Sequence, residues 1–199
     1  MAVVNYGVGN LRSIKRGLEK SGATVEITHS STDLRSSDAI VLPGVGAFSP
    51  AVKNMAPITD VVAEAMKNGK LILGVCLGLQ LLFTRSSEGG SIKGLDFLSG
   101  DIVKLPENVK IPQMGWNTLN IVQSHPLLEG VKDNSYVYFV HSYYPQPSDP
   151  DVIVATTEYG VRFPSMVAKK NLFATQFHPE KSSKTGLIML KNFVRIVKR

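Results

Sequence analysis

The sequence has very little cysteine: Cys76 is the only one among 199 residues. A lone cysteine cannot form an intramolecular disulfide or assemble a cysteine-based zinc site. A secreted disulfide scaffold is therefore excluded, and we expect a protein of the reducing cytoplasm. Cys76 itself is either a buried structural thiol or a reactive one.

Long hydrophobic runs are also missing. No stretch approaches the roughly 18 apolar residues that a membrane-spanning helix needs. The N-terminal sequence MAVVNYGVGN lacks the basic residues that precede the apolar stretch of a secretion signal. We therefore expect a soluble protein that is not exported.

The charge is unbalanced but not clustered. The chain carries a formal net charge of +6, yet its lysines and arginines form no basic run and do not alternate with aromatic residues. A solvated, mildly basic surface explains this better than nucleic-acid binding. With 43% hydrophobic residues, 19% charged residues and no linker-like segment, residues 1–199 are expected to form a single globular domain.

The first half of the chain alternates short β-branched runs with helical patterns, which predicts an α/β fold with a parallel sheet flanked by helices. After the strand expected over 38–42, Ser49 is expected to cap a helix whose first residue is Pro50, and Pro57 is expected to interrupt it. From about residue 91, short strands separated by turns predict an additional antiparallel or mixed sheet portion. A final helix is expected over 184–198.

The sharpest local feature is Gly74-Val75-Cys76-Leu77-Gly78, where an apolar strand meets a helix expected to run through Phe83. The G-x-C-x-G spacing is typical of a nucleophile elbow, a strained strand-to-helix turn that exposes its central side chain. The glycines on either side let backbones pass closely. The helix N-terminus would also favour a thiolate at Cys76. The pattern favours a nucleophilic cysteine over a structural one.

A thiol nucleophile needs a base, and His178 has the most suitable setting. It follows an apolar strand, and Glu180 lies two residues further on, beyond Pro179. A carboxylate held against one imidazole nitrogen fixes the tautomer and stabilises the imidazolium that forms when the other nitrogen takes a proton. The sequence therefore predicts a triad of Cys76, His178 and Glu180.

The remaining histidines and glycine-rich segments are not assigned chemistry. His29 and His125 are expected at the surface, and His141 is expected to pack near the site. No histidine pair has metal-ligand spacing and no G-x-x-x-x-G-K-[ST] motif is present, so neither a metal nor nucleotide hydrolysis is expected. Gly7-Val8-Gly9 resembles the start of a dinucleotide fingerprint, but Arg12 replaces the third glycine, so a tight loop is expected.

The order cysteine, histidine, glutamate resembles that of the class I, or triad, glutamine amidotransferases. Within this family, the chain resembles the glutaminase subunits of imidazole glycerol phosphate synthases. The similar segments are YGVGNLRS, LPGVGAF, GVCLGLQLLF, PQMGWN, YFVHSYY and ATQFHPEKSS. GVCLG with HPE is specific to the family, whereas PGVGAF, MGWN and HPEKSS together distinguish these subunits. Asn5 departs from the Asp that commonly precedes YG, which concerns a local loop contact.

The resemblance implies a flavodoxin-like fold and hydrolysis of L-glutamine to glutamate and ammonia, without a cofactor or metal. It also implies a heterodimer in which ammonia passes to a (β/α)8-barrel cyclase subunit. The cyclase forms imidazole glycerol phosphate and the aminoimidazole carboxamide ribonucleotide in histidine biosynthesis. In this chemistry Cys76 attacks the carboxamide carbon, His178 moves the proton and then activates water, and Glu180 orients His178.

Further positions complete the expected site. The oxyanion is expected to bind the Leu77 N–H and a backbone N–H from Gly44-Val45. Gly46 and Gln80 resemble the glutamine-binding positions of the family. Because glycines flank Val45, its peptide could rotate an N–H into or out of the oxyanion hole and gate the activity.

Trp116 and Lys181 are expected at the interface with the cyclase subunit, although a lone tryptophan also fits a protein core. Two other interpretations stay open. One is another triad amidotransferase, of the pyridoxal phosphate or anthranilate type, against which PQMGWN and HPEKSS argue. The other is a non-catalytic scaffold, against which the intact triad argues.

Overall fold

The computed structural model describes residues 1–7 and 9–199, so Val8 of the predicted Gly7-Val8-Gly9 loop lies outside the described residues. The helices and strands up to residue 81 are β1 (Ala2–Val4), α1 (Leu11–Lys20), β2 (Glu26–Thr28), α2 (Ser31–Ser36), β3 (Ala39–Leu42), α3 (Phe48–Met55), η1 (Ala56–Ile58), α4 (Thr59–Lys67), β4 (Leu71–Val75) and α5 (Leu77–Leu81). Those that follow are β5 (Phe83–Ser86), β6 (Ile92–Lys93), β7 (Leu98–Lys104), β8 (Gln113–Thr118), β9 (Asn120–Ile121), η2 (Pro126–Leu128), β10 (Tyr136–His141), β11 (Tyr143–Pro147), η3 (Pro150–Val152), β12 (Ile153–Glu158), β13 (Arg162–Lys169), β14 (Leu172–Thr175), η4 (Pro179–Lys181) and α6 (Ser183–Val197).

The largest sheet has eight strands in the order β2-β1-β3-β4-β14-β13-β12-β9. The first five run parallel, and β13, β12 and β9 extend the sheet antiparallel. Every residue of β3 is apolar and buried, as expected of a parallel strand covered on both faces. The predicted α/β fold with a mostly parallel sheet and an antiparallel portion is confirmed.

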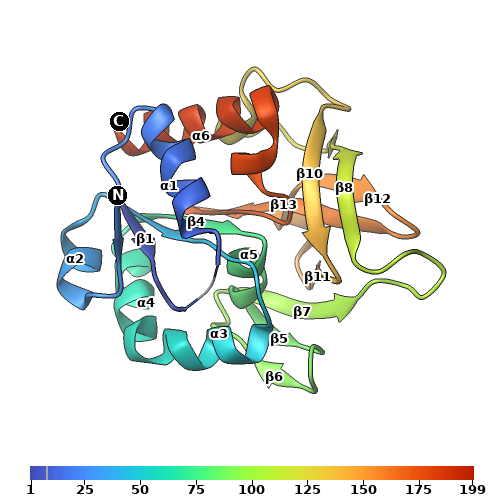
Figure 1. Ribbon diagram of the computed structural model, residues 1–199, viewed down its shortest axis with the longest axis horizontal. Helices are drawn as coiled ribbons and strands as arrows, with labels where there is room; N and C mark the ends of the chain where they lie inside the picture. The colour runs from blue at the N-terminus through green and yellow to red at the C-terminus, as the bar shows by residue number, and fades with distance from the viewer. Residues whose placement is uncertain (8) are drawn as a thin grey trace.

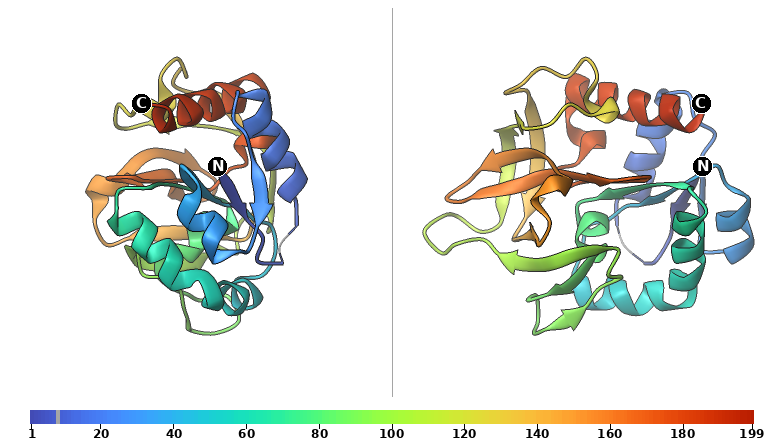
Figure 2. Two further views of the ribbon diagram at one scale, coloured as in Figure 1. Left: turned by 90° about the vertical axis from the view of Figure 1, so that its left-hand side faces the viewer. Right: turned by 180° about the vertical axis from the view of Figure 1, so that it is seen from behind.

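Helices cover both faces of this sheet, with α1 and α6 above it and α3 and α4 below it in the view of Figure 1. Figure 2 shows the same two layers from the side and from behind. One apolar core includes Leu18 of α1 and Phe193 of α6, and a second includes Met55 and Val62. No helix within residues 1–7 and 9–199 is long and apolar enough to cross a membrane.

Two smaller sheets stand beside the large one, on the right of Figure 1. One pairs β8 with β10 in antiparallel orientation, and the other has the order β11-β7-β5-β6. In the second sheet β5 and β7 run parallel whereas the other pairs are antiparallel. The change to short antiparallel or mixed strands that the sequence predicts is therefore present.

The start of α3 differs from the prediction. The helix begins at Phe48, so Ser49 and Pro50 lie inside its first turn, and Ser49 does not cap it. The N–H of Phe48 donates to Oε2 of Glu88 at 3.2 Å, so a residue distant in sequence supplies the cap. Pro57 lies in η1, which separates α3 from α4 as predicted.

The prediction that the helix after Cys76 runs through Phe83 is wrong at the C-terminal end of the helix. α5 stops at Leu81, and Phe83 already belongs to β5. The backbone after the helix bonds to the segment before β7: the N–H of Phe97 donates to the Leu82 carbonyl at 2.8 Å. This long-range pairing overrides the local helical pattern.

The carboxyl ends of β1, β3, β4 and β14 lie along one edge of the large sheet. The described segments that follow these strands are residues 5–7 with 9–10, residues 43–47, Cys76 and residues 176–178. The strand order reverses between β1 and β3, and open α/β sheets bind their ligands outside the carboxyl ends at such a point. The fold therefore brings the predicted site residues together at this edge.

Candidate active site

Cys76 lies in a strained turn between β4 and α5. Its backbone has φ 52° and ψ −103°, which is unusual for a residue other than glycine. A Cβ atom at position 78 would lie 1.8 Å from the Leu42 carbonyl oxygen, so only glycine lets α5 start against β3. The strand-to-helix turn predicted for residues 74–78 is present.

The thiol of Cys76 is nearly buried, with 5% of the residue exposed. Its Sγ lies 3.7 Å from the Val140 carbonyl oxygen and accepts a hydrogen bond from Nε2 of Gln176 at 3.6 Å. Oε1 of Gln176 in turn accepts from Nε2 of Gln80 at 3.2 Å. A chain of amide groups therefore ends at the sulfur and directs an N–H toward it.

His178 and Glu180 form a buried pair. Nδ1 of His178 lies 2.8 Å from Oε1 of Glu180, and the two side chains are 1% and 2% exposed. Burial lowers the pKa of His178, but the negative charges of Cys76 and Glu180 outweigh burial and raise it to about 10. His178 is therefore an imidazolium at neutral pH, the form that stabilises a neighbouring thiolate.

A cavity of about 240 Å³ opens at Cys76. Gly46 and Gln80, the expected glutamine-binding positions, line it together with Val45, Leu77 and His141. Glu88 also lines the cavity and is the only carboxylate that does so among the described residues. Burial raises the pKa of Glu88, and the hydrogen bond from the Phe48 N–H partly opposes this.

The two expected oxyanion segments contact each other. The N–H of Leu77 donates to the Gly44 carbonyl at 3.4 Å, so the carbonyl of the Gly44-Val45 peptide occupies this donor. Next to them, the Tyr6 hydroxyl donates to the Pro43 carbonyl. The pKa of Tyr6 is raised because burial disfavours the phenolate and because Cys76 carries negative charge nearby. Tyr6 therefore remains a hydrogen-bond donor that anchors the loop.

The other histidines lie in three different environments. His29 is exposed, as predicted. His125 is partly buried, so its prediction as a surface residue is wrong: Nδ1 accepts from the Leu127 N–H at 3.1 Å and the ring stacks edge-on against Phe173. Burial lowers the pKa of His125.

His141 packs beside the site, as predicted. Its Nδ1 lies 2.8 Å from the Tyr143 carbonyl oxygen and its Nε2 lies 2.9 Å from Oε1 of Gln113. Burial lowers its pKa to about 4; the bond to the Tyr143 carbonyl opposes this, and the charge of His178 adds to it. His141 is therefore neutral, which leaves His178 as the charged imidazole.

Trp116 lies on an exposed apolar surface and not in the core. It is 52% exposed, and its neighbours Met114 and Tyr136 are 65% and 62% exposed. Tyr138 is paired with Trp116 across β8 and β10, and Nζ of Lys181 lies 5.8 Å from the centre of the Tyr138 ring. We call Met114, Trp116, Tyr136 and Tyr138 the aromatic face. The Tyr138 carbonyl accepts from the His178 N–H at 2.9 Å, so this face adjoins the segment that carries His178 and Glu180.

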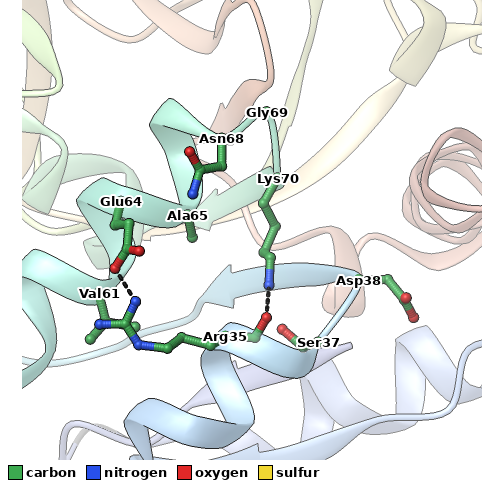
Figure 3. A pocket seen from close by; sticks show the side chains of 9 residues that line it. All are labelled: Arg35, Ser37, Asp38, Val61, Glu64, Ala65, Asn68, Gly69 and Lys70. Carbon is green, nitrogen blue, oxygen red and sulfur yellow. Dashed lines mark hydrogen bonds and ion pairs between the residues drawn. The ribbon is translucent and has the colours of Figure 1, made fainter.

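A larger pocket, of about 550 Å³, lies at the opposite edge of the sheet, before β3 and β4 (Figure 3). Its charged groups are engaged with one another: Arg35 pairs with Glu64, and Nζ of Lys70 donates to the carbonyls of Leu34 and Arg35. Lys70 thereby satisfies the last carbonyls of α2. These contacts are structural, so the candidate site is the cavity at Cys76.

A family model described as glutamine amidotransferase class-I matches residues 2–197 of the chain. The fold also resembles that of solved structures. The structure of PurLQS from Thermotoga maritima has a TM-score of 0.79 at 20% identity and covers 98% of this chain and 97% of that one. The glutaminase domain of CTPS from Trypanosoma brucei has a TM-score of 0.71 at 16% identity, and the match covers 100% of this chain and 93% of that one. The chain belongs to the class-I glutamine amidotransferase family.

Similar curated proteins include imidazole glycerol phosphate synthase subunits HisH. The relative from Natronomonas pharaonis is 48% identical, over 98% of this chain and 93% of the relative. The relative from Methanocaldococcus jannaschii is 47% identical, over 99% of this chain and 100% of the relative. The relative from Archaeoglobus fulgidus is 48% identical, over 100% of both chains. These matches place the chain in the HisH branch of the family.

Proposed function

We propose that this protein is the glutaminase subunit of an imidazole glycerol phosphate synthase in histidine biosynthesis. In this proposal the whole chain acts as one domain that hydrolyses L-glutamine to glutamate and ammonia. The observation that carries the proposal is the strained Cys76, which opens into a cavity beside the buried, charged pair of His178 and Glu180. The relatives named imidazole glycerol phosphate synthase subunit HisH support the assignment to this synthase.

The proposed reaction has two halves that use the same residues. The Cys76 thiolate attacks the carboxamide carbon of glutamine, and His178 gives its Nε2 proton to the departing ammonia. His178, now neutral, then takes a proton from water as the water attacks the γ-glutamyl thioester, which releases glutamate and restores the thiolate. Glu180 holds Nδ1 throughout, so that Nε2 is the nitrogen that exchanges protons.

Glu88 is the residue that we propose for the α-ammonium group of glutamine. It is the carboxylate of the cavity, and an amino-acid substrate carries a positive charge that needs such a partner in a partly dehydrated site. Its place at the N-terminus of α3 also stabilises its own negative charge.

Replacing Glu88 by Gln is expected to raise the KM for glutamine by about ten- to a hundredfold, the effect of losing a charged hydrogen bond, with a smaller change in kcat. The variant keeps an oxygen that can accept from the Phe48 N–H, so α3 stays capped. Steady-state glutamate release measures both constants. Glu107→Gln is the matched control, because Glu107 is exposed and, among the described residues, its carboxylate pairs only with Lys104 at 4.0 Å. If Glu88→Gln has the same KM for glutamine as the control Glu107→Gln, Glu88 is not the partner of the ammonium group.

The proposed partner is the (β/α)8-barrel cyclase subunit, which receives the ammonia in a heterodimer. Ammonia must leave Cys76 without entering bulk water, where protonation would remove its nucleophilic lone pair. The aromatic face adjoins the segment that carries His178 and Glu180 and is the exposed apolar surface that we propose for the docking of the cyclase. We place the complex in the cytoplasm, because Cys76 must remain a reduced thiol.

Trp116→Ala is expected to weaken binding of the cyclase subunit by roughly thirtyfold or more, since an exposed tryptophan at the centre of an interface is typically worth at least about 2 kcal/mol. Calorimetric titration of the two subunits measures this. Val122→Ala serves as the control, because Val122 is 46% exposed but lies outside the aromatic face. If both variants bind the cyclase as tightly as wild type, the aromatic face is not the interface.

The direct test of the proposed function is glutamate release from L-glutamine by the purified chain, by itself and with the cyclase of the same organism. We expect hydrolysis in the complex and synthesis of imidazole glycerol phosphate from glutamine. Copurification with a different synthase, together with no effect of the cyclase, would contradict the assignment.

A further inference from the structure

The helix α1 begins with an unusual cap. Asn10 is the N-cap residue and has the left-handed conformation, with φ 70° and ψ 13°. The side-chain oxygen of an asparagine at this position normally accepts a hydrogen bond from an N–H of the first helical turn. Asn10 makes no such bond. Its amide nitrogen donates instead to Oε1 of Glu180 at 2.8 Å, across 170 positions of sequence.

Glu180 depends on this contact because it has few partners. Its Oε1 accepts from both Nδ1 of His178 and the amide of Asn10, each at 2.8 Å. Oε2 is buried without a hydrogen-bond partner among the described residues. A buried carboxylate needs donors to hold both its charge and its orientation. Asn10 is the donor that can fix the rotation of the carboxylate independently of the histidine.

The helix that carries Asn10 is packed directly on the segment of Glu180. A Cβ atom at Gly17 in α1 would lie 3.4 Å from Cβ of Glu180 and 2.7 Å from Cδ1 of Leu190. The absence of a side chain at position 17 therefore allows α1 to approach this closely. Asn10 is thus held at a fixed distance from the carboxylate by a rigid element.

We propose that Asn10 is a positioning residue for the hydrolysis of glutamine. It holds Glu180 so that Oε1 faces Nδ1 of His178, and thereby aims Nε2 of the imidazole at Cys76. This inference rests on the proposed function, but the effect of His178 on the reactivity of Cys76 can also be measured without a substrate. Asn10 does not line the cavity at Cys76, so its contribution falls on kcat and not on KM.

Two substitutions separate the donor from the backbone conformation. Asn10→Gly keeps the left-handed conformation and removes the amide, whereas Asn10→Asp keeps the shape but places a second carboxylate against Glu180. In the complex with the cyclase, we expect kcat for glutamate release to fall on the order of ten- to a hundredfold for Asn10→Gly, and further for Asn10→Asp, with KM nearly unchanged. Asn134→Gly is the control, because Asn134 has a similar φ of 60° in an exposed turn.

The second measurement is the rate at which iodoacetamide alkylates Cys76 as a function of pH, which needs neither glutamine nor the cyclase. Without Asn10, the pKa of His178 is expected to fall below about 10 and alkylation at neutral pH to slow, because a loosely held Glu180 stabilises the imidazolium less. If kcat for glutamate release and the rate of Cys76 alkylation both equal the wild-type values in the two Asn10 variants, the inference is overturned. If the wild-type chain releases no glutamate but alkylation still slows in the variants, the inference is supported and the proposed function is overturned.

Discussion

Replacing Cys76 by Ala or Ser is expected to abolish glutamine hydrolysis while ammonia-dependent synthesis by the complex survives. The rate of glutamate release should fall by roughly 10⁴-fold or more, as when the nucleophile of a triad is removed. Neither substitution empties a large volume in the core, so the fold should persist. Ammonia added to the solution bypasses the glutaminase, and the cyclase should use it at the wild-type rate.

The rest of the triad provides an expected order of effects for the same assay. His178→Asn should be nearly as severe as the loss of Cys76, and Glu180→Gln should be milder because nucleophile and base stay in place. His29→Ala should have no effect, because His29 is exposed and does not line the cavity at Cys76. Hydrolysis near the wild-type rate by Cys76→Ala would show that another group is the nucleophile.

The free chain is expected to hydrolyse glutamine slowly, and the cyclase with its nucleotide bound should raise the rate by about 10²- to 10³-fold. The reason is the contact between the Leu77 N–H and the Gly44 carbonyl at 3.4 Å, which occupies one expected oxyanion donor. Rotation of the Gly44-Val45 peptide would withdraw that carbonyl and present the Val45 N–H. A single oxyanion donor is typically worth about 3–4 kcal/mol, which accounts for an effect of this size.

Rates of glutamate release for the free chain, the complex and the liganded complex measure this gating, and the amide resonance of Val45 reports the rotation. Gly44→Ala is a poor probe, because its Cβ would lie 3.0 Å from the Tyr6 hydroxyl and from Cβ of Leu77 and would disturb the loop in any state. A free chain as fast as the liganded complex would rule out gating. Stimulation without any change at Val45 would place the switch elsewhere.

The parts of the site that sequence could predict are local. A buried strand, two glycines and a helix define the turn at Cys76, and a carboxylate two residues from His178 can reach its ring without help from the rest of the fold. The short helix α2, outside the site, was not predicted although it had a local signal: Ser30 precedes Asp33 by three positions and accepts its N–H at 3.3 Å.

The parts that sequence could not predict depend on contacts between distant segments. Asn10 meets Glu180 only because α1 packs on η4, and Glu88 reaches the cavity only because it caps α3 from the turn after β5. Neither residue has a spacing that marks it. The early end of α5 has the same origin, since the backbone at Leu82 pairs with the segment before β7.

The central claim, that Cys76 is the nucleophile in a site for glutamine, is tested most directly by covalent labelling. The complex is incubated with diazo-oxo-norleucine, an electrophilic analogue of glutamine, and analysed by intact-mass and peptide mass spectrometry. We expect a single adduct on the peptide that contains Cys76, prevented by excess L-glutamine and absent from Cys76→Ala. An adduct on another residue that glutamine prevents, or continued glutamate release by the fully labelled protein, would contradict the claim.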